Sequence, residues 1–496
     1  MENQNVKDVD VCIIGAGPAG MAAAIRCAQV GAKVAVVDEQ PRPGGQIYRA
    51  VTRDGHPNGH IFGPDYLYGA NLVAQFQRAA IEHINEATLW RIDENKRVYW
   101  SRGGKAEQLQ AKRIILATGA IERAFPFPGW TLPGVMTAGA CQIMMKTSGV
   151  LPQQAVMVGT GPLLYLLAAQ MVDAGSAPLA LVDTQQPNQY FKSAKYASSL
   201  WTGRKYILKG LKLLAKLRKA GIKHYTGATD VAAFGDGKFE RLSFSCGSNL
   251  HLLEAQNCLA HIGVIPNVQL SRAMGLAHEW DNVQLCWRPS LDDYYSSSLE
   301  GVAIAGDGSG IGGALVAELQ GRLAGANALH EIGKIPPFVF SAEAKTLKKQ
   351  IRQELAIRPF LDTLYSPPRQ AMQPADDTII CRCEEVTAGQ IRQHARAGVN
   401  GINQIKTFTR CGMGPCQGRY CGPVVAQVIS MQTAQPMEKV GYYRIRHPIK
   451  PLKLGELASL TSHKQSFMHK YQHKEFKHVQ HSETIHQSTH EQSSDS

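Results

Sequence analysis

Five cysteines that lie close together in the sequence are the residues best suited to chemistry. They are Cys381, Cys383, Cys411, Cys416 and Cys421, and glycines separate the last three. Disulfides are disfavoured in a reducing compartment, and glycines let backbone N–H groups turn toward cluster sulfurs. Four thiolates would bind zinc equally well. The spacing therefore predicts a metal centre, and an electron-carrying iron–sulfur cluster is favoured over zinc if the rest of the chain binds a redox cofactor.

A glycine turn near the start of the chain has the pattern of a dinucleotide-binding site. An apolar strand ending at Ile14 runs into Gly15-Ala16-Gly17-Pro18-Ala19-Gly20, which opens an alanine-rich helix. The first glycine allows a tight turn, the second lets the backbone approach a pyrophosphate, and the third lets helix and strand pack closely. A second apolar strand, 34–37, ends in two acids placed to hold a ribose hydroxyl. The predicted contacts are Gly15, Gly17, Pro18, Ala19, Gly20, Asp38 and Glu39.

Three later segments have small residues where a backbone must lie close to a cofactor. One is a glycine loop after the acids, and the other two follow buried strands at 113–117 and 301–305. An acid beside free helix N–H groups can hold a sugar hydroxyl and a phosphate, as the ribityl chain of a flavin requires. Each segment alone is equally compatible with a plain turn, but together they make FAD the specific prediction. The predicted contacts here are Gly44, Gly45, Gln46, Thr118, Gly119, Gly306 and Asp307.

A second strand, turn and helix begin at residue 155 and copy the first pattern imperfectly. Gly159 and Gly161 match the first two glycines, but Leu164 stands at the third position, where a bulky side chain would crowd the phosphate site. No Arg or Lys closely follows Asp183, which disfavours the 2′-phosphate of NADP. The second lobe is therefore predicted to be structural only or to bind an adenine nucleotide. A buried strand, turn and helix also explain the uncharged stretch 155–172 better than a membrane span does.

Residues 205–220 have the periodicity of an amphipathic helix, with Ile207, Leu208, Leu211, Leu214 and Leu217 on one side and lysines on the other. Two interpretations are open. The apolar side packs on its own domain, which we favour, or it meets a membrane surface or a partner.

Composition sets the broad class of the protein. The chain has 496 residues, 44% hydrophobic and 19% charged, which fits two to four globular domains. Its net charge of +13 is spread out without interleaved aromatics, so an acidic partner or a solvated surface is expected and nucleic acid is not. The first ten residues lack a secretory core, and a cytoplasmic location follows, with attachment to the inner membrane as an option. Polar, His-rich composition predicts disorder from about residue 458.

Taken together, these motifs resemble the flavoprotein oxidoreductases with two dinucleotide-binding domains, and among them the A or alpha subunits of opine oxidases, hydrogen cyanide synthase and proline or hydroxyproline dehydrogenases. The segments that carry the resemblance lie at 38–49, 305–308 and 412–419. The cysteine-rich part is similar to the [2Fe-2S] domain of bacterioferritin-associated ferredoxin. This resemblance implies Cys381, Cys383, Cys416 and Cys421 as ligands, with Cys411 spare, although the spacing also permits Cys411 with Cys416 as the second pair.

The resemblance also implies cofactors and partners. It implies FAD, a [2Fe-2S] cluster and a partner subunit similar to D-amino-acid oxidase that oxidises a secondary amine, with a quinone among the acceptors. It allows FMN at a subunit interface and a small ferredoxin-like subunit. Nothing in this chain supplies an obvious base for amine oxidation, so no catalytic residue is assigned. Two alternatives are a self-contained NAD(P)H-dependent reductase and a non-enzymatic scaffold that binds zinc.

The expected fold is α/β, a Rossmann-like flavoprotein with two dinucleotide-binding domains and a small C-terminal helical iron–sulfur domain. The expected boundaries are 1–125 and 269–338 for the FAD domain, 126–268 for the second lobe, 339–375 for a helical, Pro-rich linker, 376–432 for the cysteine-rich domain and 433–496 for a C-terminal extension.

Overall fold

The computed structural model describes residues 6–53 and 61–460. The chain divides into two compact units, and the larger comprises residues 6–100 and 108–451 of the described part. The smaller unit contains residues 101–107 and 452–460, where the Ala106 N–H donates to Ser459 Oγ at 2.8 Å beside the short helix α17 (Leu454–Ala458). The tail predicted to be disordered lies almost entirely outside the described residues.

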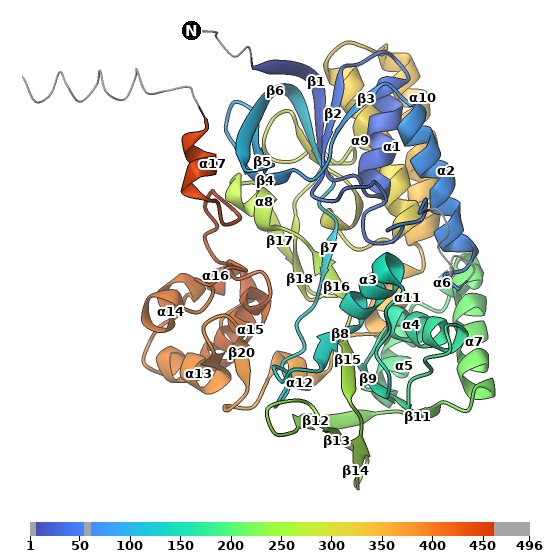
Figure 1. The fold of residues 1–496 in the computed structure, drawn as a ribbon, viewed down its shortest axis with the longest axis vertical. Helices are drawn as coiled ribbons and strands as arrows, with labels where there is room; N and C mark the ends of the chain where they lie inside the picture. Colours follow the sequence, from blue (N-terminus) through green and yellow to red (C-terminus); the bar gives the residue numbers. More distant parts are fainter. Residues whose placement is uncertain (1–5, 54–60, 461–496) are drawn as a thin grey trace, which may run out of the picture. The chain divides into compact units, whose positions relative to one another are not determined.

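The first lobe is a seven-stranded sheet with helices packed against it (Figure 1). Its central strand, β1 (Lys7–Ile14), pairs in parallel with β2 (Val34–Val37) on one side and β6 (Lys105–Leu116) on the other. The last six residues of β1 are all buried. Burial on both faces explains why these strands are continuous apolar runs. The strand order is β3 (Ile81–Ile84), β2 (Val34–Val37), β1 (Lys7–Ile14), β6 (Lys105–Leu116), β5 (Arg97–Arg102), β4 (Thr88–Ile92), with β19 (Val302–Ile304) paired to β6. The helices are α1 (Pro18–Ala28), α2 (Pro64–Arg78), α9 (Ala314–Glu331) and α10 (Pro337–Leu355).

Small residues allow α1 and α9 to pack closely. A Cβ added at Gly321 would lie 2.0 Å from the Ala19 carbonyl oxygen, and one at Gly325 would lie 3.0 Å from the Ala23 oxygen. The two backbones therefore approach at distances that larger side chains would prevent, and this contact fixes the start of α1 beneath the first glycine turn.

The second lobe has a five-stranded sheet whose paired strands are all parallel. The uncharged stretch 155–172 forms its strand β9 (Ala155–Gly159) and most of helix α4 (Pro162–Asp173), which confirms the prediction of a buried strand, turn and helix. Within the described chain, no helix is both long enough and apolar enough to cross a bilayer. The order is β11 (Lys223–Tyr225), β10 (Ala180–Asp183), β9 (Ala155–Gly159), β15 (Asn257–His261), β8 (Val135–Thr137). The helices are α3 (Ala138–Ser148), α4 (Pro162–Asp173), α5 (Pro187–Ala194), α6 (Ser199–Thr202) and α7 (Arg204–Lys219), and β12 (Ala228–Phe234), β13 (Arg241–Cys246) and β14 (Asn249–Glu254) form an antiparallel sheet beside them.

The amphipathic helix is present as α7, but the favoured prediction that its apolar side packs on its own domain is wrong for most of that side. Leu217 is buried and Ile207 is half-buried, whereas Leu208, Leu211 and Leu214 are exposed. The reason is geometric: α7 packs along α4 at the margin of the lobe, and this contact covers only a narrow stripe.

Two antiparallel strands, β7 (Ala120–Glu122) and β16 (Val264–Pro266), connect the lobes (Figure 1). The chain leaves the first sheet through β7 and returns through β16. The segment that follows contains α8 (Gln269–Ala273), β17 (His278–Asp281), β18 (Cys286–Pro289) and the 3-10 turn η1 (Gly306–Gly308).

The cysteine-rich part is a small helical module whose buried apolar residues form one continuous cluster with those of the second lobe. Thr387 caps α13 (Ala388–Arg396) by accepting from the Gln390 N–H, and the Gln390 side chain accepts from the Thr387 N–H, which forms a capping box. Ile391, Ile405 and Ile429 fill the centre of the module. Its elements are β20 (Ile379–Cys381), β21 (Val386–Thr387), α13 (Ala388–Arg396), α14 (Ile402–Thr409), α15 (Cys421–Thr433) and α16 (Met437–Val440), preceded by α11 (Arg358–Leu364) and α12 (Arg369–Met372). Two Rossmann-like lobes and a C-terminal helical module confirm the predicted fold class.

Candidate cofactor sites

The four predicted strand ends of the first lobe meet at one edge of its sheet. Ile14 lies in register with Val37 on one side and Leu116 on the other, and Leu116 lies in register with Ile304. All these pairs are parallel, so the residues after each strand emerge side by side at the carboxyl edge, where open α/β sheets bind ligands.

The first glycine turn is shaped by backbone contacts that leave no space for side chains. Gly15 has φ +104°, and a Cβ on it would lie 2.5 Å from the Ala117 carbonyl oxygen. A Cβ on Gly20 would lie 1.8 Å from the Gly15 oxygen. Both positions therefore require glycine.

The same turn presents free donors to an anion. Helix α1 starts at the N-cap Gly17 with Pro18 and Ala19 in its first turn, and among the described residues no side chain caps it and no acid lies in that turn. The first N–H groups of a helix have no partner within the helix, and the helix dipole favours negative charge there. The arrangement fits a pyrophosphate.

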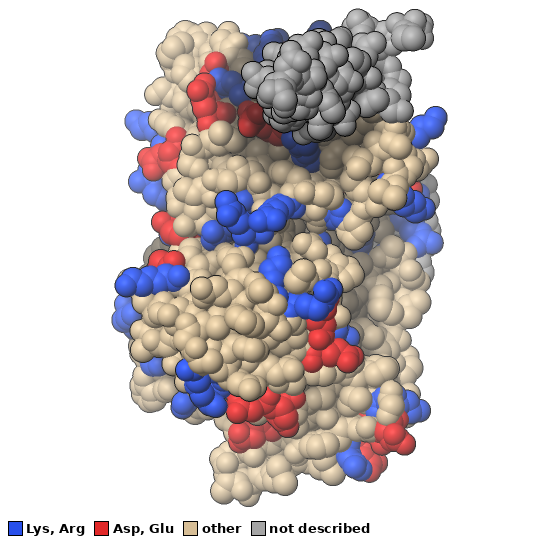
Figure 2. Space-filling model, turned by 90° about the vertical axis from the view of Figure 1, so that its left-hand side faces the viewer, with Lys and Arg blue, Asp and Glu red and all other residues tan. Residues whose placement is uncertain are grey.

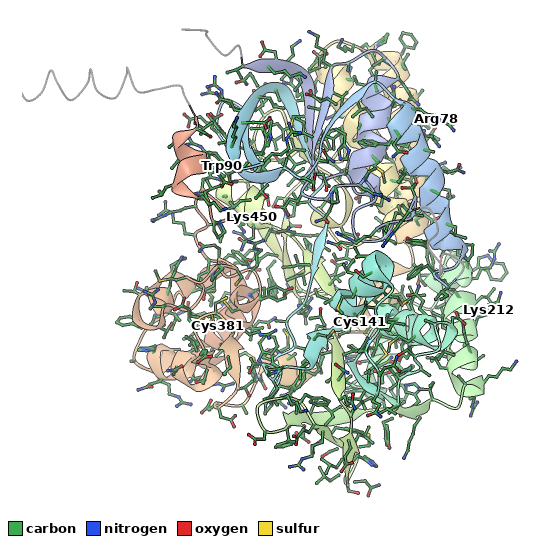
Figure 3. All side chains as sticks on the ribbon, viewed as in Figure 1. Arg78, Trp90, Cys141, Lys212, Cys381 and Lys450 are labelled. Carbon is green, nitrogen blue, oxygen red and sulfur yellow. The ribbon has the colours of Figure 1, made fainter. Side chains whose placement is uncertain are left out.

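The two acids after β2 have different surroundings. Asp38 accepts from the Ala16 N–H at 2.5 Å and from the Gln40 N–H at 2.6 Å, and burial raises the pKa of its carboxyl. Its carboxylate thereby lies at the mouth of the turn. Glu39 is more exposed and forms an ion pair with Lys450, which Figure 3 labels. Asp38 is thus the acid that lies beside the candidate ribose site.

The Gly44–Gln46 loop lies directly on the turn. The Gly44 N–H donates to the Ala16 oxygen at 2.8 Å, and a Cβ on Gly45 would lie 2.8 Å from the Gly17 Cα. From the second lobe, Lys146 on α3 donates to the carbonyl oxygens of Gln46 at 3.1 Å and Ile47 at 2.9 Å. Burial lowers the pKa of Lys146 to about 7. This lysine, which the sequence did not single out, ties the loop to the second lobe.

The remaining predicted contacts lie together on the same edge. A Cβ on Gly308 would lie 3.4 Å from both Thr118 Oγ1 and the Gly119 oxygen, so η1 and the end of β6 are neighbours. Asp307 accepts from the N–H groups of Gly312 and Gly313 at 2.9 Å, and its carboxylate therefore lies at the start of α9. Gly306 donates to Gln320 Oε1 at 2.9 Å.

The glycine cradle, the uncapped start of α1 and the acids at the sheet edge fit the phosphates and hydroxyls of a dinucleotide. FAD would supply hydride and single-electron chemistry at this edge. The structure brings all fourteen of the predicted contact residues to one sheet edge, but their roles in binding stay predictions.

The second glycine turn has the same backbone shape but different side chains. Gly159 has φ +130°, and a Cβ on it would lie 1.7 Å from the His261 carbonyl oxygen. Leu164 is fully buried in the core of the second lobe. Asp183 is 2% exposed, and it accepts from the Tyr165 hydroxyl and, at 2.9 Å, from the Gln185 N–H. Asp38 also accepts two hydrogen bonds but is only half-buried, so burial is what removes the acid of the second turn from a ribose.

The five thiols of the cysteine-rich module lie close together. The sulfurs of Cys381, Cys411 and Cys421 are all within 4.8 Å of one another, and all three residues are buried. Hydrogen bonds connect Cys416 to Cys421 and Cys383. Figure 3 labels Cys381 in this module and Cys141 on α3 in the second lobe. The group of sulfurs within 4.8 Å thus contains two of the four predicted ligands, Cys381 and Cys421, together with Cys411, the thiol expected to be spare. Cys383 and Cys416 lie outside this group and join it through the hydrogen bonds of Cys416.

Hydrogen bonding among the thiols favours two thiolates. Bonds from Cys411 and Cys421 lower the pKa of Cys381 to about 2, and a bond from Cys421 is the main cause that lowers the pKa of Cys416 to about 5. Thiolates are the form that binds metals. The donor set therefore fits a thiolate-held centre, for which both iron–sulfur and zinc chemistry are available, and the choice of four ligands from the five stays a prediction.

Glycines surround Tyr443 beside the thiols. Cβ atoms on Gly412 and Gly418 would lie 2.6 and 2.3 Å from the ring of Tyr443, and both glycines have positive φ. The ring is buried and contacts the thiol of Cys411. Tyr443 therefore gives the glycine-rich loop its shape and lies against the candidate metal site.

One short segment connects the two candidate sites. The Asn267 N–H donates to the Gly119 oxygen at 3.0 Å, and two residues later the Gln269 Nε2 donates to the Gln417 oxygen at 2.9 Å. Because Gln417 follows Cys416, residues 267–269 bridge the end of β6 and the thiol loop.

A buried carboxylate and imidazole pair was not predicted from the sequence. Glu122 Oε1 lies 2.8 Å from His261 Nδ1, and Glu122 also accepts from the Gly139 N–H at 3.0 Å. The pair joins β7 to β15. No motif of the sequence marks this pair, whose members are 139 positions apart in the chain.

The chain has relatives along most of its length. The family model described as pyridine nucleotide-disulphide oxidoreductase matches residues 9–321, and the sarcosine oxidase A3 domain matches residues 376–460. The A subunit of opine oxidase from Rhizobium meliloti is 41% identical over 91% of this chain and 87% of its own length. The A subunit of opine oxidase from Agrobacterium tumefaciens strain Ach5 is 41% identical over 91% of this chain and 92% of its own length.

Less similar proteins also match this chain along most of its length. Hydrogen cyanide synthase subunit HcnB of Pseudomonas protegens is 31% identical over 89% of this chain and 95% of its own length. Among solved structures, L-proline dehydrogenase from P. horikoshii superposes with a TM-score of 0.67 at 23% identity, covering 92% of this chain and 81% of that one. This last similarity concerns the fold.

Proposed function

The chain belongs to the family of flavin oxidoreductases that includes the A subunits of opine oxidases, and on this premise we propose that it is the electron-handling subunit of a heteromeric amine dehydrogenase. FAD binds at the carboxyl edge of the first sheet, and a [2Fe-2S] cluster binds among the five thiols. A partner subunit similar to D-amino-acid oxidase removes hydride from the C–N bond of an opine or imino acid. Electrons leave to an acceptor such as a quinone.

The observation that carries the proposal is the presence of two kinds of candidate cofactor site in one compact unit. A dinucleotide cradle alone is found in many reductases, and a thiol cluster alone is compatible with zinc. Together, connected through residues 267–269, they favour a flavin and an iron–sulfur cluster that exchange electrons.

The residues of this chain position the cofactors. The N–H groups at the start of α1 hold the pyrophosphate, Asp38 holds the ribose, and Lys146 fixes the loop beside it. The thiolates hold the iron, and Gln269 fixes the backbone after Cys416.

The test is anaerobic co-purification with the partner subunit, followed by titration with candidate amines. We expect one class of secondary amine to bleach the flavin bands and the longer-wavelength iron–sulfur absorption together. Zinc without iron in the purified complex would refute electron transfer through the thiols. Rapid bleaching of the isolated chain by NADH would favour a self-contained reductase instead.

Single serine substitutions resolve the ligand set. Cys416→Ser is expected to abolish the cluster absorption, whereas Cys411→Ser is expected to retain it if Cys411 is spare. Loss of the cluster in Cys411→Ser and its retention in Cys383→Ser would assign Cys411 as a ligand in place of Cys383.

A further inference from the structure

Helix α7 carries an exposed apolar strip surrounded by basic residues. Its sixteen residues include Lys and Arg but neither Asp nor Glu. Leu208 is 56% exposed and Leu211 is 58% exposed. With 3.6 residues per turn, Leu208, Leu211 and Ala215 lie on one face of the helix. Lys212, Arg218 and Lys219 are also exposed beside this strip.

The opposite side of α7 packs against its own lobe. Leu217 is buried there, and Lys205, Lys209 and Lys216 form ion pairs with Glu354, Asp65 and Asp173. On the exposed side, no acid of the described chain lies within ion-pair distance of Lys212, Arg218 or Lys219. Figure 3 labels Lys212 at the outer edge of the second lobe. The positive charge of this side is thus not neutralised by the described part of the chain.

Exposed aromatic side chains precede the helix. Trp201 is 79% exposed and its ring centroid lies 5.7 Å from the Arg204 guanidinium, and Phe191 on α5 is 82% exposed. Single exposed apolar residues are ordinary, but Trp201 lies beside Arg204 at the start of α7, and α6 and α7 contact each other, so this ring adds to the apolar strip of α7. Trp and Leu beside Lys and Arg are the composition of helices that lie in a membrane interface.

We propose that the exposed side of α7, together with Trp201, docks this protein on the surface of an anionic phospholipid bilayer. The basic residues attract the lipid head groups, and the leucines and the Trp201 ring enter the interfacial layer. Because no acid of the described chain neutralises these basic residues, we expect the surface to bind anionic lipid more strongly than neutral lipid. The proposal concerns peripheral binding and is independent of which cofactors the protein carries.

The test uses the full-length chain in flotation with vesicles of phosphatidylcholine, with and without phosphatidylglycerol. We expect binding to the anionic vesicles that weakens as salt rises, and a blue shift of tryptophan fluorescence that is lost in Trp201→Phe. The double variant Leu208→Asn with Leu211→Asn is expected to bind at least about tenfold more weakly, because two leucines no longer leave water.

A matched control keeps the test specific. Leu250 and Leu252 on β14 are also exposed leucines, and the double variant Leu250→Asn with Leu252→Asn is expected to bind like the wild type. Failure of the wild type to bind anionic vesicles, or equal binding by the α7 variant, would overturn the proposal. If the wild type does not bind vesicles and the α7 variant no longer binds the partner subunit, the exposed side of α7 is a protein interface instead.

Discussion

The two glycine turns of this chain begin alike and end differently. In both, the first glycine has a positive φ and lies against a neighbouring strand end, Gly15 against Ala117 and Gly159 against His261. The third position is Gly20 in one turn and the buried Leu164 in the other. Asp38 lies half-buried at the mouth of its turn, whereas Asp183 is covered and bonded to Tyr165.

The difference separates the residues that make the fold from the residues that bind a nucleotide. A first glycine is needed wherever a strand, turn and helix pack this closely, whether or not a ligand binds. The third glycine and an available acid distinguish the first lobe. We therefore expect FAD in the first lobe and a structural role for the second turn.

The largest effect is expected from making the first turn resemble the second. Gly20→Leu places side-chain atoms where even a Cβ would lie 1.8 Å from the Gly15 oxygen, so we expect loss of FAD and a loss of about 3 kcal/mol or more in the free energy of unfolding. Flavin content and denaturant unfolding measure it. A stable Gly20→Leu protein that still binds FAD would contradict the proposed difference between the two turns.

The two acids provide the next contrast. Asp38→Asn is expected to weaken FAD binding about tenfold to hundredfold, because a hydrogen bond to a charged group is worth about 1.5–3 kcal/mol. Asp183→Asn is the matched control and is expected to leave FAD affinity unchanged while lowering stability, since its partner Tyr165 is buried. Both affinities are measured by flavin fluorescence titration of the apoprotein. Equal losses of FAD affinity in the two variants would contradict the assignment.

A pH effect is expected from Lys146, which connects the lobes. Its pKa is lowered to about 7 from an ordinary value of 10.5, so between these pH values the unfolded chain binds a proton that the native protein does not. The free energy of unfolding contributed by this residue therefore rises with pH, by at most about 1.4 kcal/mol per unit, and is flat below pH 7. Unfolding at pH 7 and pH 9 measures it, with Lys146→Met as the variant that loses the slope. A wild-type slope that persists in Lys146→Met would show that other groups cause it.

Much of the first site could be predicted from the sequence because its geometry follows from local patterns. Each strand end is an apolar run followed by small residues or an acid, and parallel strands bring such ends to one edge. The pair Glu122 and His261 could not be predicted, because the antiparallel pairing of β7 with β16 that brings them together joins segments far apart in the sequence.

The cysteine cluster shows the limit of spacing arguments. Cys411 was expected to be spare, yet Arg410 adopts a left-handed conformation that ends α14 and turns Cys411 into the module beside Cys381 and Cys421.

Likewise, the periodicity of α7 identified its apolar residues but not which side the lobe would cover, because that depends on the position of α4. On the face that carries the cysteine-rich module, basic and acidic side chains occur in separate small groups (Figure 2).

The most direct test of the electron-handling role is low-temperature electron paramagnetic resonance of the anaerobically purified complex after reduction by its amine substrate. The account predicts the signal of a reduced [2Fe-2S] cluster, with about two iron atoms and two inorganic sulfides for each FAD of this chain. Zinc in the thiol site and no iron signal in a complex that still oxidises the amine would contradict it.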